Sequence, residues 1–221
     1  MIEDQHKFIF VRNPKTASTS IHLSLNKNKS NIQFNFIRLK EATGKAWDNA
    51  LNDDHPDCSQ YKRFFPKKYE QYFKFSFVRN PWARIYSIYI ESKNFYLKFY
   101  EKESITFEKF LNSISNHPQQ YLDSTNQLRK LPTTKRFDQF GNQYRFTKGC
   151  DFIGKFENLQ KDFYIICDKL SIPHLKIFHK NRKHPDIKYK NYLDGYNNKT
   201  KKIVADLCHE DIKHFGYEFG K

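Results

Sequence analysis

Three apolar stretches of the chain each predict a β-strand that is followed by a helix. They lie at residues 7–12, 72–79 and 150–156. The second stretch alternates phenylalanine with lysine and serine, and a period of two is typical of a strand. Strand and helix units that repeat in this order favour an α/β fold with a central parallel sheet flanked by helices.

Apolar residues at helical spacing follow each of these strands. Ile21 and Leu25 lie four apart after the first strand, and Asn80 and Pro81 supply an N-cap and a first helical residue after the second. A third helix is predicted from Asn158. Further helices are predicted at 106–115 and at about 199–214. The polar segments 28–70 and 117–149 are predicted to be irregular and to lie over the carboxyl ends of the strands, where ligands bind.

Composition limits the class of protein. The chain has 221 residues, 38% of them hydrophobic and 17% aromatic, which predicts one globular domain over 1–221. No apolar run approaches the roughly 20 residues of a membrane span and the start lacks a signal-peptide pattern, so we expect a cytoplasmic protein. The cysteines form no CxxC pair, which indicates a reducing compartment and no zinc site. They are Cys58, Cys150, Cys167 and Cys208.

The formal net charge of +15 favours anionic partners, such as a nucleotide, a nucleic acid, an acidic glycan or a membrane surface. The alternative is a lysine-rich surface that is merely solvated. Charge alone does not decide between these interpretations.

The first two strand-to-helix turns share the sequence Val-Arg-Asn-Pro, at 11–14 and 78–81. The unpaired amides and positive dipole at the start of a helix make such a turn suited to an anion. The first turn adds a charge and several hydroxyl groups. These come from Lys15, Thr16, Ser18, Thr19 and Ser20. The turn lacks the glycines of a Walker loop, GxxxxGK[ST].

In the second turn, Arg79 ends the strand and Ser87 lies eight residues later in the predicted helix. Arginine offers a planar fork for a phosphate group, and serine offers a further donor. Two anion sites at the ends of neighbouring strands predict a ligand with phosphates at two ends. The alternative is a pair of ordinary capped helices with surface charges.

The segments PKTASTS (14–20) and FVRNPWARIYSIY (77–89) resemble the two signatures of sulfotransferases that use 3′-phosphoadenosine 5′-phosphosulfate (PAPS). The chain resembles the family 2, carbohydrate-type branch in particular, through DFIGKFENLQKDF (151–163), HPQQYL (117–122) and DIKHFGYEF (211–219). The resemblance implies a three-layer, P-loop-like fold, PAPS as donor, 3′,5′-ADP as product and no metal. It implies a hydroxylated acceptor, a glycan, and no specific nucleic-acid partner.

The resemblance also implies roles for residues of the two turns. Lys15 stabilises the leaving oxygen and the moving sulfuryl group, while Arg79 and Ser87 hold the 3′-phosphate. The 5′-phosphate is held by Lys15, Thr16, Ala17, Ser18, Thr19 and Ser20. Ala17 stands where many relatives carry glycine, so an ordinary backbone conformation is expected at this position.

Histidine suits the general base that must remove the proton of an acceptor hydroxyl near neutral pH. His55 aligns with a histidine-bearing stretch of the family, and the alternative is an exposed loop histidine. His117 is the second candidate, and His117 and Arg129 are expected to contact the acceptor. Asn181 and Arg182 match a segment near the nucleotide, although a solvated charge run is the default for such a basic cluster.

Two other functions fit parts of the sequence. A small-molecule or nucleotide kinase also binds phosphate with a strand–loop–helix unit, but this chain lacks the Walker glycines and a clear aspartate for magnesium. A basic nucleic-acid-binding protein fits the charge, but the basic residues are scattered and no nucleic-acid motif is present.

Overall fold

The computed structural model describes residues 1–26, 36–37, 55–100, 106–116, 142–178 and 191–221. Their contacts divide the chain into two compact units. Unit 1 comprises Met1–Arg79 and Gln143–His184, and unit 2 comprises Asn80–Asn142 and Pro185–Lys221.

Unit 1 contains a mixed β-sheet in which the three predicted strands are parallel to one another. Its described strands are β1 (Ile2–Glu3), β2 (Phe8–Phe10), β3 (Phe36–Ile37), β4 (Phe73–Val78) and β5 (Phe152–Lys155), in the order β3-β1-β2-β4-β5. The pairs β2–β4 and β4–β5 are parallel, whereas β1 pairs antiparallel with both β2 and β3. The predicted parallel sheet is therefore confirmed for β2, β4 and β5. The edge formed by β1 and β3 was not predicted, and the short turn between β1 and β2 permits only antiparallel pairing there.

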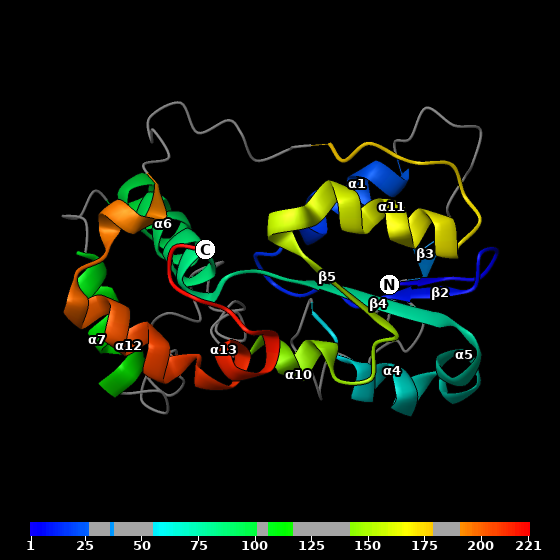
Figure 1. Ribbon diagram of the computed structural model, residues 1–221, viewed down its shortest axis with the longest axis horizontal. Coiled ribbons are helices and arrows are strands. Elements are labelled where there is room, and N and C mark those ends of the chain that lie inside the picture. Colours follow the sequence, from blue (N-terminus) through cyan, green and yellow to red (C-terminus); the bar gives the residue numbers. More distant parts are fainter. Residues whose placement is uncertain (27–35, 38–54, 101–105, 117–141, 179–190) are drawn as a thin grey trace. The chain divides into compact units, whose positions relative to one another are not determined.

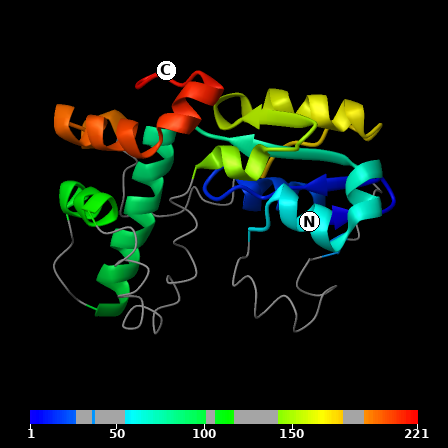
Figure 2. The same cartoon turned by 90° about the horizontal axis from the view of Figure 1, so that it is seen from below.

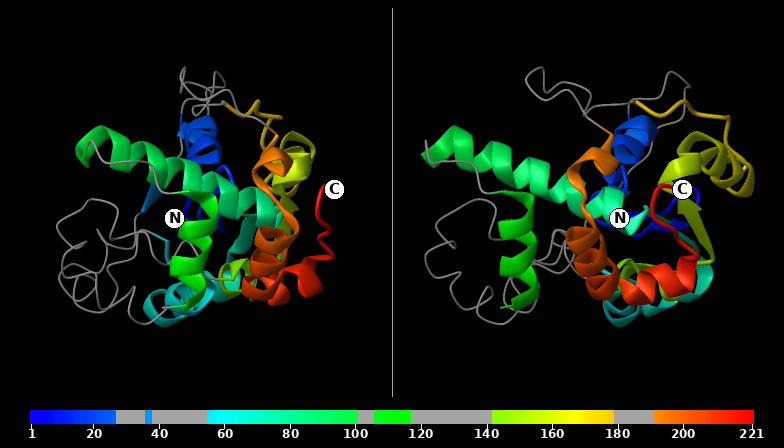
Figure 3. Two further views of the ribbon diagram at one scale, coloured as in Figure 1. Left: turned by 90° about the vertical axis from the view of Figure 1, so that its left-hand side faces the viewer. Right: turned by 60° about the vertical axis from the view of Figure 1, so that its left-hand side comes forward.

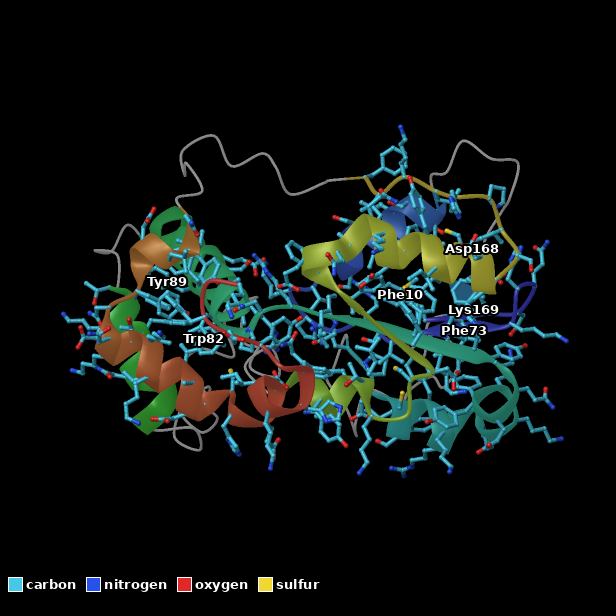
Figure 4. The ribbon with its side chains drawn as sticks, viewed as in Figure 1. Phe10, Phe73, Trp82, Tyr89, Asp168 and Lys169 are labelled. Carbon is cyan, nitrogen blue, oxygen red and sulfur yellow. The ribbon has the colours of Figure 1, made fainter. Side chains whose placement is uncertain are left out.

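Helices cover both faces of this sheet (Figures 1 and 2). On one face, Phe8, Phe10, Phe75 and Phe77 pack against α1 (Ser18–Asn26) and α11 (Leu159–Lys169). Figure 4 labels Phe10 in this layer. On the other face, Ile9 and Val11 pack against α4 (Cys58–Phe64) and α10 (Gln143–Thr147). The period of two along each strand thus supplies two apolar cores, one above and one below the sheet.

Helices also occupy parts of the two segments that were predicted to be irregular. Helix α4 and all but the last residue of α5 (Pro66–Gln71) lie within 28–70, and α10 lies within 117–149. Asp57 and Gln60 form a reciprocal capping box at the start of α4, and Pro66 is the first residue of α5. The prediction was wrong because short helices are specified by these caps rather than by apolar periodicity.

The regular elements that the structure describes in unit 2 are all helices, as Figure 3 shows from two directions. Its elements are α6 (Pro81–Tyr100), α7 (Phe107–Asn116), the 3₁₀ helix η4 (Tyr192–Gly195), α12 (Asn198–Leu207) and α13 (His209–Phe215). The ring of Phe107 lies 4.9 Å from Tyr196, 5.0 Å from Tyr89 and 5.2 Å from Tyr86, between ring centroids. Trp82 and Tyr89, both on α6, are labelled in Figure 4. The single helix predicted at 199–214 is divided at Cys208.

A buried polar group lies within unit 2. Arg84 on α6 is fully buried, and so are Cys208 and Asp211 from the segment where α12 gives way to α13. Burial lowers the pKa of Arg84, while the nearby Cys208 and Asp211 act in the opposite direction. These charged and polar side chains therefore belong to the interior of unit 2.

Candidate active site

The carboxyl ends of β2 and β4 lie side by side because these strands are parallel neighbours. Phe10 pairs with Phe75, and the Val11 N–H donates to the Phe75 carbonyl over 2.9 Å. Beyond the strands, the Asn13 Nδ2 donates to the carbonyl of Phe77 over 3.0 Å. The turn after β2 and the end of β4 are thereby fixed to each other within unit 1.

The turn after β2 has an alternating backbone conformation. Lys15 and Ala17 have φ values of +63° and +64°, whereas Thr16 between them has no positive φ. Residues that alternate between left- and right-handed conformations direct successive amides into one concavity that binds anions. The expectation of an ordinary conformation at Ala17 was wrong. The left-handed conformation costs an L-residue about 1–2 kcal/mol, and local hydrogen bonds such as Thr16 Oγ1 to the Asn13 carbonyl, 2.9 Å, help to hold it.

Helix α1 starts directly after this turn with three amides that lack a partner in the helix. The Ile21 N–H donates to the Ala17 carbonyl over 3.0 Å, so the N–H groups of residues 18–20 have no acceptor four residues earlier. The first turn of α1 carries no acidic side chain. Arg12 Nη2 reaches Thr19 Oγ1 at 3.5 Å, and it adds a positive charge to this helix end. The turn and the start of α1 therefore form a local environment suited to an anion.

Arg79, at the end of β4, is held by three groups. The buried Gln143 pairs with its backbone in both directions: the Arg79 N–H donates to Gln143 Oε1 and Gln143 Nε2 donates to the Arg79 carbonyl, each over 2.8 Å. The guanidinium lies 4.2 Å from the ring centroid of Phe156, at the start of the 3₁₀ helix η2 (Phe156–Asn158). Arg79 Nη1 also donates to the Lys15 carbonyl over 3.4 Å. The two residues that the sequence assigns to opposite ends of one ligand are thus in contact.

His55 lies beside the same turn. Its Nδ1 is 3.1 Å from the carbonyl of Arg12. A carbonyl oxygen can only accept, so Nδ1 carries the proton in this hydrogen bond, and Nε2 is the unprotonated nitrogen of the neutral ring. An imidazole in this tautomer is able to accept a proton at Nε2.

The other predicted site residues lie on α1, on α6 or outside the described residues. Ser18 and Ser20 are buried and Thr19 is half-buried at the start of α1. Ser87 is half-buried on α6 in unit 2. His117, Arg129, Asn181 and Arg182 lie outside the described residues. Their assigned roles stay predictions.

Sequence reasoning missed Arg12, Gln143 and Phe156. Arg12 had a signal, because it occupies the same place in the first Val-Arg-Asn-Pro as Arg79 does in the second. Gln143 and Phe156 had none, because they meet Arg79 only through packing between distant segments.

Comparison with known proteins identifies the family of this chain. A model of the sulfotransferase family, in its family 2 form, matches residues 1–218. The chain belongs to the sulfotransferase family. The match covers both units, so the resemblance predicted from the sequence is confirmed over nearly the whole sulfotransferase chain. An uncharacterized protein of Archaeoglobus fulgidus is 30% identical over 108 residues, which are 48% of this chain and 74% of that protein.

Among the helices that the structure describes, none combines the length and hydropathy needed to cross a bilayer. In the same part of the chain, no group of three or more histidine, cysteine, aspartate or glutamate side chains is arranged to hold a metal ion.

Proposed function

We propose that this sulfotransferase uses PAPS as its donor and transfers the sulfuryl group to a hydroxyl of a carbohydrate, within a P-loop-like fold. The observation that carries the proposal is the hydrogen bond between Arg79 Nη1 and the Lys15 carbonyl. It brings two anion-binding elements together, as a ligand with phosphates at both ends requires. The net charge of +15 supports an anionic ligand.

The residues after β2 suit the 5′ end of the donor. The alternating turn and the start of α1 make the backbone amides of residues 16–20 suited to an anion. Thr16 acts through its backbone N–H, because its hydroxyl already donates to Asn13. Lys15 supplies a positive charge at the same turn.

Arg79 suits the 3′-phosphate, with Ser87 as the second ligand that the family resemblance assigns. The guanidinium is preorganised, because Gln143 fixes the Arg79 backbone and the guanidinium lies over the Phe156 ring. Such support lowers the entropy lost when an arginine side chain binds a phosphate. Asn181 and Arg182 are assigned to the nucleotide, and His117 and Arg129 to the acceptor.

The donor, when bound, supplies a sulfuryl group that is already activated by its link to a phosphate. Lys15, Arg12 and the α1 amides provide a positive field that stabilises negative charge as it develops on the phosphate oxygen. His55 Nε2 takes the proton of the acceptor hydroxyl, while Nδ1 remains hydrogen-bonded to Arg12. Positioning and charge neutralisation, rather than a covalent enzyme intermediate, account for the catalysis.

Transfer of labelled sulfate from PAPS to a panel of glycans and small hydroxylated metabolites tests this function. Lys15→Ala is expected to lower turnover by about 100-fold, by analogy with the loss of an oxyanion donor. Lys62→Ala is the matched control, because Lys62 is an exposed lysine on α4. Equal turnover of the Lys15 variant and the control, at saturating PAPS, would show that Lys15 does not have this role.

The assignment of His55 has a separate test. His55→Ala is expected to abolish transfer and to leave the affinity for 3′,5′-ADP unchanged, since His55 is assigned to the acceptor proton alone. A variant with normal turnover would exclude His55 as the base. A variant that loses 3′,5′-ADP binding as well would show that the residue maintains the turn instead.

A further inference from the structure

Two cysteines that are far apart in the sequence meet inside unit 1. Cys58 is the first residue of α4, and Cys150 lies between α10 and β5, 92 residues later. Their sulfur atoms are 3.6 Å apart, within the distance of an S–H···S contact. Cys58 is buried, whereas Cys150 as a residue is partly exposed.

The surroundings of the pair favour sulfur chemistry. Lys74 forms an ion pair with Asp151, 3.0 Å from Nζ to Oδ2, and places a positive charge near the two thiols. The hydrogen bond with Cys150 has the largest effect on the pKa of Cys58 and lowers it. The Tyr69 hydroxyl also lowers this pKa, whereas burial and Asp57 raise it. The same hydrogen bond raises the pKa of Cys150. Cys58 is therefore the thiol of the pair that more readily becomes a thiolate.

We propose that Cys58 and Cys150 are a redox modification site that a low-molecular-weight disulfide, such as oxidised glutathione, converts to an intramolecular disulfide. Cys150, the more exposed residue of the pair, loses its proton and its sulfur attacks the reagent. The reagent's S–S bond breaks, and one glutathione leaves with that proton. The Cys58 thiolate then attacks the Cys150 sulfur and releases the second glutathione, which takes up the proton of Cys58. The two protein thiols lose two electrons, and the reagent gains them.

The change of geometry is small. The sulfur atoms have to approach from 3.6 Å to a bond length of about 2.0 Å. The segments on either side are already in contact, since Arg145 Nε of α10 lies 3.2 Å from Asp57 Oδ2 at the start of α4. The disulfide therefore joins elements that pack together without it.

The position of the disulfide links it to the candidate active site. Cys58 lies three residues after His55, and Cys150 follows the helix from which Gln143 holds Arg79. Oxidation would covalently join these two segments of unit 1. A cross-link that closes so long a loop restricts the unfolded chain, so the oxidised form is expected to unfold at a higher temperature.

The experiment treats the reduced, folded, full-length protein with oxidised glutathione and maps its cysteines by mass spectrometry without reduction. We expect a protein lighter by two hydrogen atoms, with Cys58 and Cys150 in one linked peptide, and full reversal by dithiothreitol. A pair that stays reduced in the folded protein would overturn the proposal. A link to Cys167 or Cys208, or between two copies of the chain, would overturn it too.

Variants separate the two steps. In Cys58→Ala, glutathione is expected to remain attached to Cys150, because no second thiol displaces it. Cys167→Ala is the matched control, because it removes a buried cysteine outside the pair and is expected to leave the cross-link intact. Failure of Cys58→Ala to retain glutathione would contradict the assignment of Cys150 as the first thiol to react. If that variant does not fold, the wild-type peptide map still decides the proposal.

Discussion

Replacement of Ala17 by glycine is expected to stabilise this protein, although glycine usually destabilises. The φ of Ala17 is +64°, in the region where a Cβ costs about 1–2 kcal/mol. Glycine removes that strain because it has no Cβ. Glycine also gives the unfolded chain more freedom, which costs about 0.4–1 kcal/mol. The net expectation is a gain of about 0.8 kcal/mol, or a rise of about 2 °C in Tm for a chain of this size.

Ala83→Gly is the matched control for this prediction. Ala83 is buried in the first turn of α6 and has no positive φ, so the same chemical change relieves no strain there. It is expected to lower the free energy of unfolding by about 1 kcal/mol. Thermal unfolding followed by circular dichroism compares both variants with the wild type. A fall in Tm for Ala17→Gly similar to that for Ala83→Gly would refute the strain at Ala17.

Three further predictions concern packing, positioning and pH. A Cβ at Gly154 would lie 2.4 Å from Cε1 of the buried Phe77, so Gly154→Ala is expected to lower the free energy of unfolding by about 1–3 kcal/mol; an unchanged urea midpoint would contradict this. Gln143→Ala removes two hydrogen bonds from the backbone of Arg79 and should weaken 3′,5′-ADP binding, measured by calorimetry, at least about tenfold. Equal affinity of the variant and the wild type for 3′,5′-ADP would show that Gln143 does not position Arg79. Burial raises the pKa of Cys208 to about 12, so the contribution of this thiol to stability is present below about pH 9 and is lost as pH rises toward 12. Between pH 8 and pH 10.5, the free energy of unfolding measured in urea should fall by about 2 kcal/mol more in the wild type than in Cys208→Ala. Equal falls in the two proteins would count against this pKa.

The elements that the sequence predicted correctly have local signals. Helix α1 spans Ser18–Asn26 as the spacing of Ile21 and Leu25 indicates. Helix α6 begins at Pro81, and Asn80 Oδ1 accepts from the Trp82 N–H over 3.1 Å, as its predicted N-cap role requires. These features depend on residues within a few positions of one another, so the sequence contains the information directly.

The missed features depend on short elements or on distant contacts. Strands β1 and β3 have two residues each, too few for a periodic pattern. The pairing of Gln143 with Arg79 and the approach of Cys58 to Cys150 arise only when the sheet assembles from separate segments. The left-handed backbone at Ala17 was missed because alanine itself gives no sign of it.

The central claim is that the turn after β2 and the end of β4 bind opposite ends of one doubly phosphorylated nucleotide. Calorimetric titration of wild type and Arg79→Ala with 3′,5′-ADP and with 5′-AMP, which lacks the 3′-phosphate, tests it most directly. The account predicts that Arg79→Ala weakens 3′,5′-ADP at least about tenfold, as expected for a lost charged hydrogen-bond partner, and leaves 5′-AMP binding unchanged. Equal weakening of both ligands, or equal wild-type affinity for both, would contradict it.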